Sequence, residues 1–198
     1  MGIAEVTPRR AVFLDRDGVI NEPVIRDGKP YPPATVDELK LIAGVQDALS
    51  RLDELGFLLL VVTNQPDVAR GAQTREAVTQ MHARLSASLP IRGFMVCFHD
   101  NADNCSCRKP LPGLILEAAG KYGIDVQKSY LIGDRWRDID AGWAAGCKTI
   151  LIDYGYRERG PTHSPDKLVA NLSQAVEWIT WDMLKLVPNQ TRSSTPPR

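Results

Sequence analysis

Short apolar runs that alternate with helical segments constrain the fold of this chain more than any other feature. The runs are typical of buried strands, and they are Ala11–Leu14, Leu58–Val62, Phe94–Cys97, Tyr130–Ile132 and Thr149–Ile152. The segments with helical spacing of apolar residues are Gly44–Leu55, Thr74–Ser88, Gly113–Tyr122, Ile139–Ala145 and Asn171–Leu186. This alternation predicts an α/β fold, in which a parallel sheet carries helices on both faces and forms three layers.

Domain organisation follows from the spacing of these elements. The segment Asn21–Leu41 is rich in proline and charge and is predicted to be a loop. Only 47 residues separate Asp15 from Thr63, and 45 separate Thr63 from Lys109, so neither interval has room for a large cap domain. We expect one domain over residues 1–187. Residues 188–198 are dominated by Pro, Ser, Thr and Arg, a composition that predicts a disordered tail.

Composition excludes several classes of partner. The 24 basic and 24 acidic residues cancel, and no basic stripe supports binding to nucleic acid. No apolar run reaches the length of a membrane span. Residues 1–10 hold two arginines and a proline but no apolar core of a signal peptide. The sequence therefore predicts a cytoplasmic monomer that acts on a small molecule.

Polar groups follow three of the apolar runs at the point where each ends. Asp15-Arg16-Asp17-Gly18 follows the first run, Thr63-Asn64-Gln65 the second, and Gly133-Asp134 the third. Two carboxylates this close oppose each other's ionisation. A bound Mg²⁺ ion would offset their repulsion, because it is a cation that prefers oxygen ligands. A solvated turn after a strand is the alternative reading of the acid pair. Because ligands bind at the carboxyl ends of parallel strands, these groups are expected to converge.

A cluster of cysteines and histidine occupies residues 97–107, here called the Cys/His loop. Cys97, His99, Cys105 and Cys107 follow the spacing C-x-H, five residues, then C-x-C. Three thiolates and one imidazole suit tetrahedral zinc and leave no open position, which indicates a structural site. Disulfide bonds are the alternative in an extracellular protein, but a reducing compartment favours metal. The fourth cysteine, Cys147, precedes an apolar run and is expected to be a buried small residue.

The order of these motifs resembles that of the haloacid dehalogenase (HAD) superfamily of phosphohydrolases. The resemblance rests on Asp15-x-Asp17-Gly18, Thr63-Asn64, Lys109 and Gly133-Asp134-x-x-x-Asp138, in that order. Three further segments narrow the resemblance from the superfamily to one subfamily. They are Phe13–Asn21, Ala69-Arg70-Gly71 and the passage of the Cys/His loop into Arg108-Lys109-Pro110. They are similar to the subfamily that contains D-glycero-D-manno-heptose 1,7-bisphosphate 7-phosphatases and histidinol-phosphate phosphatases.

This resemblance implies a chemical role for each motif. Asp15 would be the nucleophile that forms an aspartyl-phosphate, and Asp17 the general acid and base. Asp15, the main-chain carbonyl of Asp17 and Asp134 would hold Mg²⁺. Thr63 and Lys109 would hold the phosphoryl oxygens. Asp138 would orient Lys109 or a metal-bound water.

Substrate contacts are also implied by the resemblance. They fall in Pro23–Arg26 and Thr63–Pro66, with Arg26, Asn64, Gln65, Arg108 and Arg135 as the candidate residues. Arg108 is the best candidate for a second phosphate, because a guanidinium binds phosphate through two parallel hydrogen bonds.

The sequence departs from the heptose phosphatase pattern at Pro66-Asp67, where serine and glycine are usual. The stretch between His99 and Cys105 is short, as in histidinol-phosphate phosphatases. The favoured substrate is heptose 1,7-bisphosphate, with histidinol phosphate or another small sugar or polyol phosphate as alternatives.

A receiver domain is the alternative from another class, since it also combines acids, a threonine and a lysine at strand ends. Its phosphate acceptor lies on the third strand, however, and it has no Cys/His loop. A stable phosphate acceptor would also not need the second acid, Asp17.

Overall fold

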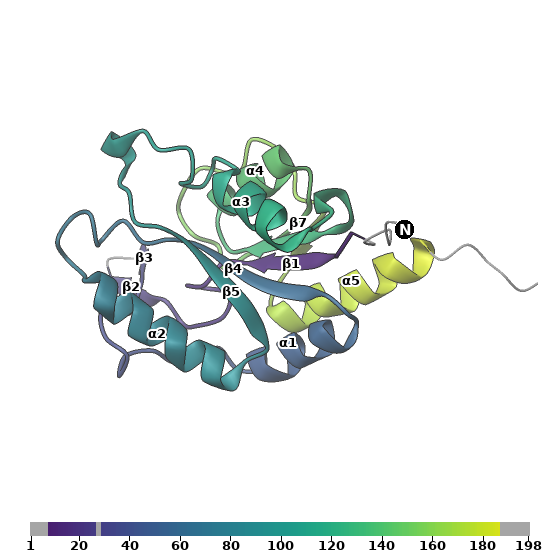
Figure 1. Cartoon of the computed structure of the whole chain (residues 1–198), viewed down its shortest axis with the longest axis horizontal. Helices are drawn as coiled ribbons and strands as arrows, with labels where there is room; N and C mark the ends of the chain where they lie inside the picture. Colours follow the sequence, from purple (N-terminus) through teal and green to yellow (C-terminus); the bar gives the residue numbers. More distant parts are fainter. Residues whose placement is uncertain (1–7, 27–28, 187–198) are drawn as a thin grey trace, which may run out of the picture.

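The computed structural model describes residues 8–26 and 29–186, which fold into a six-stranded sheet between two layers of helices (Figure 1). The strands are β1 (Ala11–Leu14), β4 (Leu58–Asn64), β5 (Ile91–Cys97), β6 (Tyr130–Gly133), β7 (Lys148–Ile152) and β8 (Lys167–Val169). Their order is β5-β4-β1-β6-β7-β8, and every neighbouring pair is parallel. This confirms the predicted sheet. The tail predicted over residues 188–198 lies outside the described residues.

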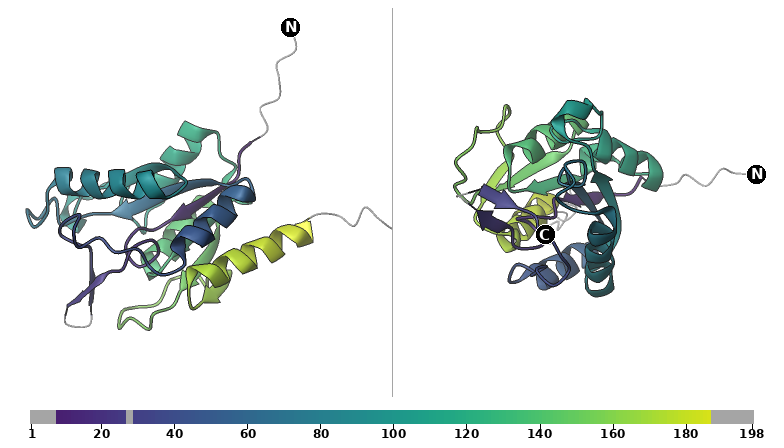
Figure 2. Two further views of the ribbon diagram at one scale, coloured as in Figure 1. Left: turned by 90° about the horizontal axis from the view of Figure 1, so that it is seen from below. Right: turned by 90° about the vertical axis from the view of Figure 1, so that its left-hand side faces the viewer.

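Helices cover both faces of the sheet. One face carries α1 (Val45–Glu54), α2 (Arg75–Ser88) and α5 (Leu172–Leu186), and the other carries α3 (Gly113–Tyr122) and α4 (Trp136–Ala145) (Figures 1 and 2). Alternate residues of β1 divide between these layers: Val12 and Leu14 pack under the first set of helices, and Phe13 under the second. Burial on both faces explains why the strands read as continuous apolar runs. Within the described ranges, none of the helices is both long and apolar enough to cross a lipid bilayer.

The segment between β1 and α1 differs from the loop predicted over Asn21–Leu41. It contains a hairpin in which β2 (Val24–Arg26) pairs with β3 (Lys29–Tyr31) in antiparallel register. This hairpin projects from the body of the domain (Figure 2, left). Strands of three residues are too short for a clear alternation of apolar and polar residues, so the sequence pattern missed them. β8 was missed for the same reason. The 3₁₀ turns at Asn101–Asp103 and Val126–Lys128 were also missed, because three residues are too few for a helical period.

The strand order places a crevice at the centre of the sheet. The chain passes outward from β1 to β4 and β5, then returns to the other side of β1 to form β6 and β7. The order therefore reverses between β1 and β6, and open parallel sheets bind their ligands outside the carboxyl ends of the strands at such a point. Asp15 and Asp134 follow the paired ends of β1 and β6.

Candidate active site

A polar cavity of about 290 Å³ lies at the carboxyl ends of β1, β4 and β6. Asp15 follows β1, Asn64 ends β4, and Asp134 follows β6, as the sequence predicts. The base of the β2–β3 hairpin closes one side of the cavity through Tyr31 and Pro32. Its remaining charged lining residues are Asp17, Asp67, Arg70, Arg108, Lys109, Arg135, Arg137 and Asp138.

Lys109 is buried between two carboxylates at the bottom of the cavity. Its Nζ lies 2.9 Å from Asp15 Oδ1 and 2.5 Å from Asp138 Oδ1, and it donates to the carbonyl of Val62 at 2.7 Å. Burial disfavours the ammonium charge, but Asp138 and Asp15 outweigh it and raise the pKa of Lys109. Burial also raises the pKa of Asp15 to about 6, although Lys109 opposes this. The arrangement holds a fixed positive charge beside a carboxylate that is poorly solvated.

Asp134 presents a buried carboxylate to the same place. It is 4% exposed, and among the described residues no donor makes a well-formed hydrogen bond to either of its oxygens. Burial, and then the charges of Asp15 and Asp138, raise its pKa well above the ordinary value. Burial and the nearby Asp134 carboxylate in turn raise the pKa of the Tyr156 phenol. A buried carboxylate without well-formed hydrogen bonds is costly unless a cation or a proton satisfies it.

A metal ion fits this group of acids. One carboxylate oxygen from each of Asp15, Asp134 and Asp138 lies within 4.8 Å of the others. Gly18 leaves the space beside them open, since a Cβ atom there would lie 2.1 Å from Asp134 Oδ2. Oxygen ligands of this kind suit Mg²⁺, and they fit it better than a softer metal. Asp138 is engaged elsewhere, because Lys109 and the main-chain N–H of Arg135 already bind its two oxygens.

Asp17 lies at the cavity wall, held by three side chains. Its carboxylate accepts hydrogen bonds from Arg16 at 2.8 Å, Asn21 at 2.9 Å and Gln65 at 2.8 Å. Arg16 is fully buried, and its guanidinium lies 3.5 Å from the ring of His82. Burial and the Arg16 charge lower the pKa of His82 to about 4. Because the His82 ring is then neutral, the Arg16 guanidinium has Asp17 as its charged partner.

Thr63 and Gln65 are fully buried at the end of β4 and do not line the cavity. Gln65 donates to the Thr63 hydroxyl at 2.9 Å as well as to Asp17, and it accepts from Arg16 at 3.3 Å. The sequence predicts Gln65 as a substrate contact, whereas the structure places it behind the cavity wall as a link between Asp17 and Thr63. Arg16 and Asn21 were not singled out from the sequence. An arginine between two aspartates was the available signal.

Asn64 fixes the backbone of Lys109. Its side-chain amide donates to the Lys109 carbonyl at 3.0 Å and accepts from the Lys109 N–H at 3.1 Å. This paired hydrogen bond joins the end of β4 to the segment that follows the Cys/His loop. Asn64 also lines the cavity, where the sequence predicts a substrate contact.

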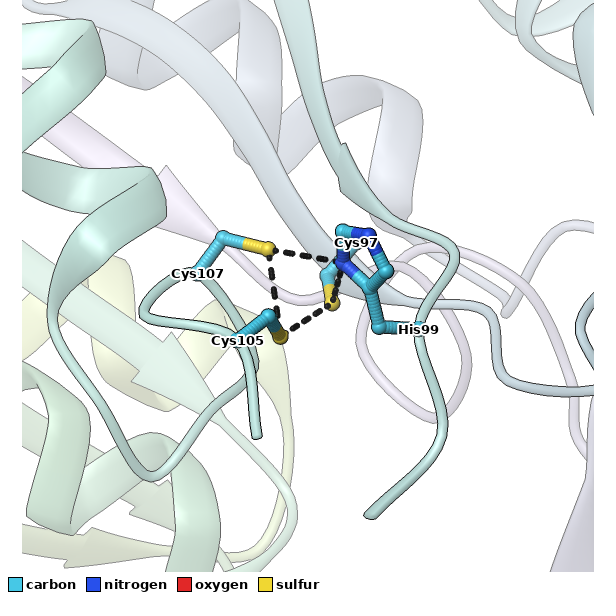
Figure 3. A group of neighbouring side chains, drawn as sticks. All are labelled: Cys97, His99, Cys105 and Cys107. Carbon is cyan, nitrogen blue, oxygen red and sulfur yellow. Dashed lines mark hydrogen bonds between the residues drawn. The ribbon is translucent and has the colours of Figure 1, made fainter. Parts of the chain in front are cut away.

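The four predicted metal ligands of the Cys/His loop converge (Figure 3). Cys97 Sγ lies 3.7 Å from Cys105 Sγ and 3.7 Å from His99 Nδ1, while Cys107 Sγ lies 3.5 Å from Cys105 Sγ and 3.3 Å from His99 Nδ1. Zn–S bonds of about 2.3 Å and Zn–N bonds of about 2.0 Å in a tetrahedron would separate two sulfurs by about 3.8 Å and a sulfur from the nitrogen by about 3.5 Å. The four cysteines of the chain are free, and the observed spacings are too long for disulfide bonds. The donor set and its geometry fit zinc.

The arginines around the cavity differ in their partners. Arg135 forms a close ion pair with Glu158, and Arg70 pairs with Asp100 at 2.7 Å and with Asp67 at 3.3 Å. Arg108 instead donates to neutral acceptors on the Cys/His loop, the Asn101 side chain at 2.9 Å and the His99 carbonyl at 3.2 Å. Arg26 ends β2, and its side chain lies outside the described part of the structure.

Comparison with known proteins agrees with this geometry. A family model described as HAD-hydrolase-like matches residues 106–175. The D-glycero-beta-D-manno-heptose-1,7-bisphosphate 7-phosphatase of Neisseria meningitidis is 37% identical over 148 residues, which cover 72% of this chain and 76% of that protein. The enzyme of the same name from Helicobacter pylori is 33% identical over 182 residues, covering 88% and 99%.

The chain belongs to the heptose bisphosphate phosphatase family of HAD-like hydrolases. Like the other members of this family, it is a phosphoric monoester hydrolase. A solved structure agrees: the D,D-heptose 1,7-bisphosphate phosphatase of B. bronchiseptica, complexed with magnesium and phosphate, superposes with a TM-score of 0.76. It is 27% identical, and the match covers 87% of this chain and 99% of that one.

The structure shows how the charge of Asp67, a departure from the pattern of heptose phosphatases, is compensated. Asp67 brings a negative charge to the cavity wall, but Arg70 binds it and also binds Asp100 of the Cys/His loop. The main-chain carbonyl of Asp67 accepts from the N–H groups of Ala72 and Gln73, which fixes the loop. The charge of Asp67 is therefore balanced within the wall rather than directed at a phosphate.

Proposed function

We propose that this protein removes the 7-phosphate of D-glycero-D-manno-heptose 1,7-bisphosphate by way of an aspartyl-phosphate. The observation that carries the proposal is the group formed by Asp15, Lys109 and Asp134 at the carboxyl ends of β1 and β6. It combines a poorly solvated carboxylate, a fixed cation and a buried carboxylate that receives no well-formed hydrogen bond from the described residues. The relatives named above carry the same substrate in their names.

Asp15, the main-chain carbonyl of Asp17 and Asp134 would hold Mg²⁺. The ion would neutralise charge on the transferring phosphoryl group and orient it for in-line attack. Asp138 lies in the same acid group, but its bonds to Lys109 and Arg135 suit it to positioning the lysine.

Two displacements then complete the hydrolysis. A carboxylate oxygen of Asp15 attacks phosphorus and the bond from phosphorus to the sugar oxygen breaks. Asp17, which must bind a proton before this step, gives that proton to the leaving alkoxide. Asp17, now ionised, takes a proton from water, whose oxygen attacks the same phosphorus. The bond from phosphorus to Asp15 breaks, inorganic phosphate leaves, and both carboxyl groups return to their starting states.

Other residues support these displacements by position. Lys109 is within reach of a phosphoryl group on Asp15, and its ammonium can stabilise the charge on the phosphoryl oxygens. The Thr63 hydroxyl is buried behind the cavity wall and accepts from Gln65, so the proposed contact with another of these oxygens requires it to become accessible when substrate binds. The three donors around Asp17 set where its carboxylate lies when substrate enters. The Cys/His loop, loaded with zinc, would fix Arg108 and Lys109, which follow it directly.

A phosphate-release assay with Mg²⁺ tests this function. Both anomers of heptose 1,7-bisphosphate, histidinol phosphate and common hexose phosphates are supplied to the full chain, and phosphorus NMR follows which phosphate is lost. We expect the highest kcat/KM on a heptose 1,7-bisphosphate, with loss of the 7-phosphate signal alone. A preference for histidinol phosphate, or a stable phosphoprotein without turnover, would contradict the proposal.

A further inference from the structure

Among the described residues, two guanidinium groups at the cavity form no ion pair with a carboxylate. Arg108 comes from the end of the Cys/His loop and Arg137 from the first turn of α4, and both line the same cavity. Within residues 8–26 and 29–186, neither lies within ion-pair distance of an acid, whereas the other two cavity arginines, Arg70 and Arg135, are paired. Arginines that only stabilise a fold normally form ion pairs with acids. Two arginines that form no such pair beside a substrate cavity therefore indicate a site that binds an anion.

Arg137 is held in place by an aromatic ring. Its guanidinium lies 4.4 Å from the centroid of Trp136, and the guanidinium of Arg159 lies 3.3 Å from the same ring. Arg159 is in turn bound to Asp140 at 3.4 Å. Contact with an indole ring orients a guanidinium without neutralising it, because the ring carries no net charge. Arg137 is therefore restrained but keeps its hydrogen-bonding capacity for another group.

The local electrostatics favour an incoming anion. Burial, and then the charges of Arg108 and Arg135, lower the pKa of Arg137, which means that these cations lie close enough to repel one another. Glu158 offsets part of this charge but is engaged by Arg135. A phosphate between Arg108 and Arg137 would relieve the repulsion and could accept paired hydrogen bonds from each guanidinium.

The position of this pair relative to the reaction centre decides which phosphate it meets. Arg108 directly precedes Lys109, and Arg137 follows Asp134 by three residues, so both reach the cavity from segments that also carry the reaction centre. The reacting phosphate is proposed to occupy the space beside Asp15 and Lys109. We propose that Arg137, together with Arg108, binds the phosphate that is not hydrolysed. Arg137 is then a specificity-determining residue for bisphosphates, an inference that rests on the proposed function.

Steady-state kinetics of four proteins test this role. Wild type, Arg137→Ala, Arg137→Lys and the control Arg84→Ala, which removes an exposed arginine of α2, are assayed with Mg²⁺ on heptose 1,7-bisphosphate and heptose 7-phosphate. The readout is the ratio of kcat/KM for the bisphosphate to kcat/KM for the monophosphate. We expect R137A to lower this ratio about tenfold, the scale of one lost charge-assisted hydrogen-bonding group. R137K should fall between, because it keeps the charge but not the planar fork.

A binding measurement separates this inference from the proposed function. The Kd of heptose 1,7-bisphosphate is measured by calorimetry in Asp15→Asn, with and without R137A, so that no turnover is needed. A weaker Kd with R137A supports the subsite even if wild type proves inactive on this sugar. An active wild type whose ratio and Kd are unchanged by R137A overturns the subsite and leaves the proposed function standing.

Discussion

At the scale of single residues, the reaction should depend on the oxygen of Asp15. Asp15→Asn replaces the attacking carboxylate oxygen by an amide of nearly equal size, and we expect phosphate release with Mg²⁺ to fall at least about 10³-fold. Thermal unfolding should stay within a few degrees of wild type, because the amide still fits the site. Asp47→Asn, an exposed change on α1, is the matched control. Retained turnover in D15N would remove the nucleophile assignment.

Lys109 belongs to the same scale, because it balances two buried carboxylates. Its side chain is 2% exposed between Asp15 and Asp138, so Lys109→Met leaves both acids without their cation. We expect a loss of about 3 kcal/mol in the free energy of unfolding at pH 7. Asp138→Asn added to K109M should return part of that loss, since one of the two uncompensated charges is gone. Denaturant unfolding of K109M, D138N and the double variant measures this coupling, and additive losses would contradict it.

At the scale of elements, the Cys/His loop should act as a unit whose integrity depends on metal. Cys105→Ser removes one of four converging ligands, so we expect zinc content to fall and the free energy of unfolding to drop by at least about 2 kcal/mol. Elemental analysis and thermal melting of C105S measure both effects. Cys147→Ala is the control, because Cys147 is buried away from the cluster and should leave zinc unchanged. Native protein without zinc would contradict the assignment.

The contact between α5 and the sheet should make the stability of the fold depend on pH in the acid range. Asp182 of α5 accepts hydrogen bonds from Tyr130 and Lys148, each at 2.6 Å. Burial opposes the charge, but these bonds outweigh it and hold the pKa of Asp182 below its usual value. A group with a lowered pKa in the folded state stabilises the protein above its unfolded pKa of about 3.9, and that contribution is lost as pH falls through the folded pKa.

Asp182→Asn should therefore cost about 1 kcal/mol at pH 6. The difference from wild type should shrink as the pH falls below about 4, where Asp182 in wild type also becomes neutral. Urea unfolding of both proteins from pH 3 to pH 7 measures this difference. A gap that stays constant over the whole range would show that the charge of Asp182 does not anchor α5.

Elements also show what the sequence could and could not predict. Long apolar or strongly periodic segments predicted their elements, as with β1 and α3, whose bounds match the sequence pattern. The hairpin β2–β3 was missed because strands of three residues give no usable period. β4 extends two residues beyond its apolar run, through Thr63 and Asn64, because pairing with β5 continues past the buried core.

At the scale of the whole molecule, the sequence could predict some parts of the site and not others. Residues that carry the chemistry stand at strand ends and could be placed from the order of the motifs. The network of Arg16, Asn21 and Gln65 around Asp17 could not, because it joins β1 to the end of β4 through side chains whose directions the pattern does not fix. The ion pairs of Arg70 with Asp67 and Asp100, and the lack of an ion pair for Arg137 among the residues that the structure describes, likewise depend on loops that meet only in the folded chain.

The two metal sites of the molecule should be separable. The acid group at the cavity would fill only part of the coordination shell of Mg²⁺, so the ion there keeps water ligands and exchanges readily, whereas the Cys/His loop supplies all four ligands of a tetrahedral zinc ion. Brief treatment with EDTA should abolish phosphate release, with zinc content retained by elemental analysis and the melting temperature lowered by no more than a few degrees. Added Mg²⁺ should restore the activity, and added Zn²⁺ should not. Loss of zinc in step with activity, or recovery with Zn²⁺ alone, would mean that one metal serves both functions and that the division into a reaction site and a structural loop is wrong.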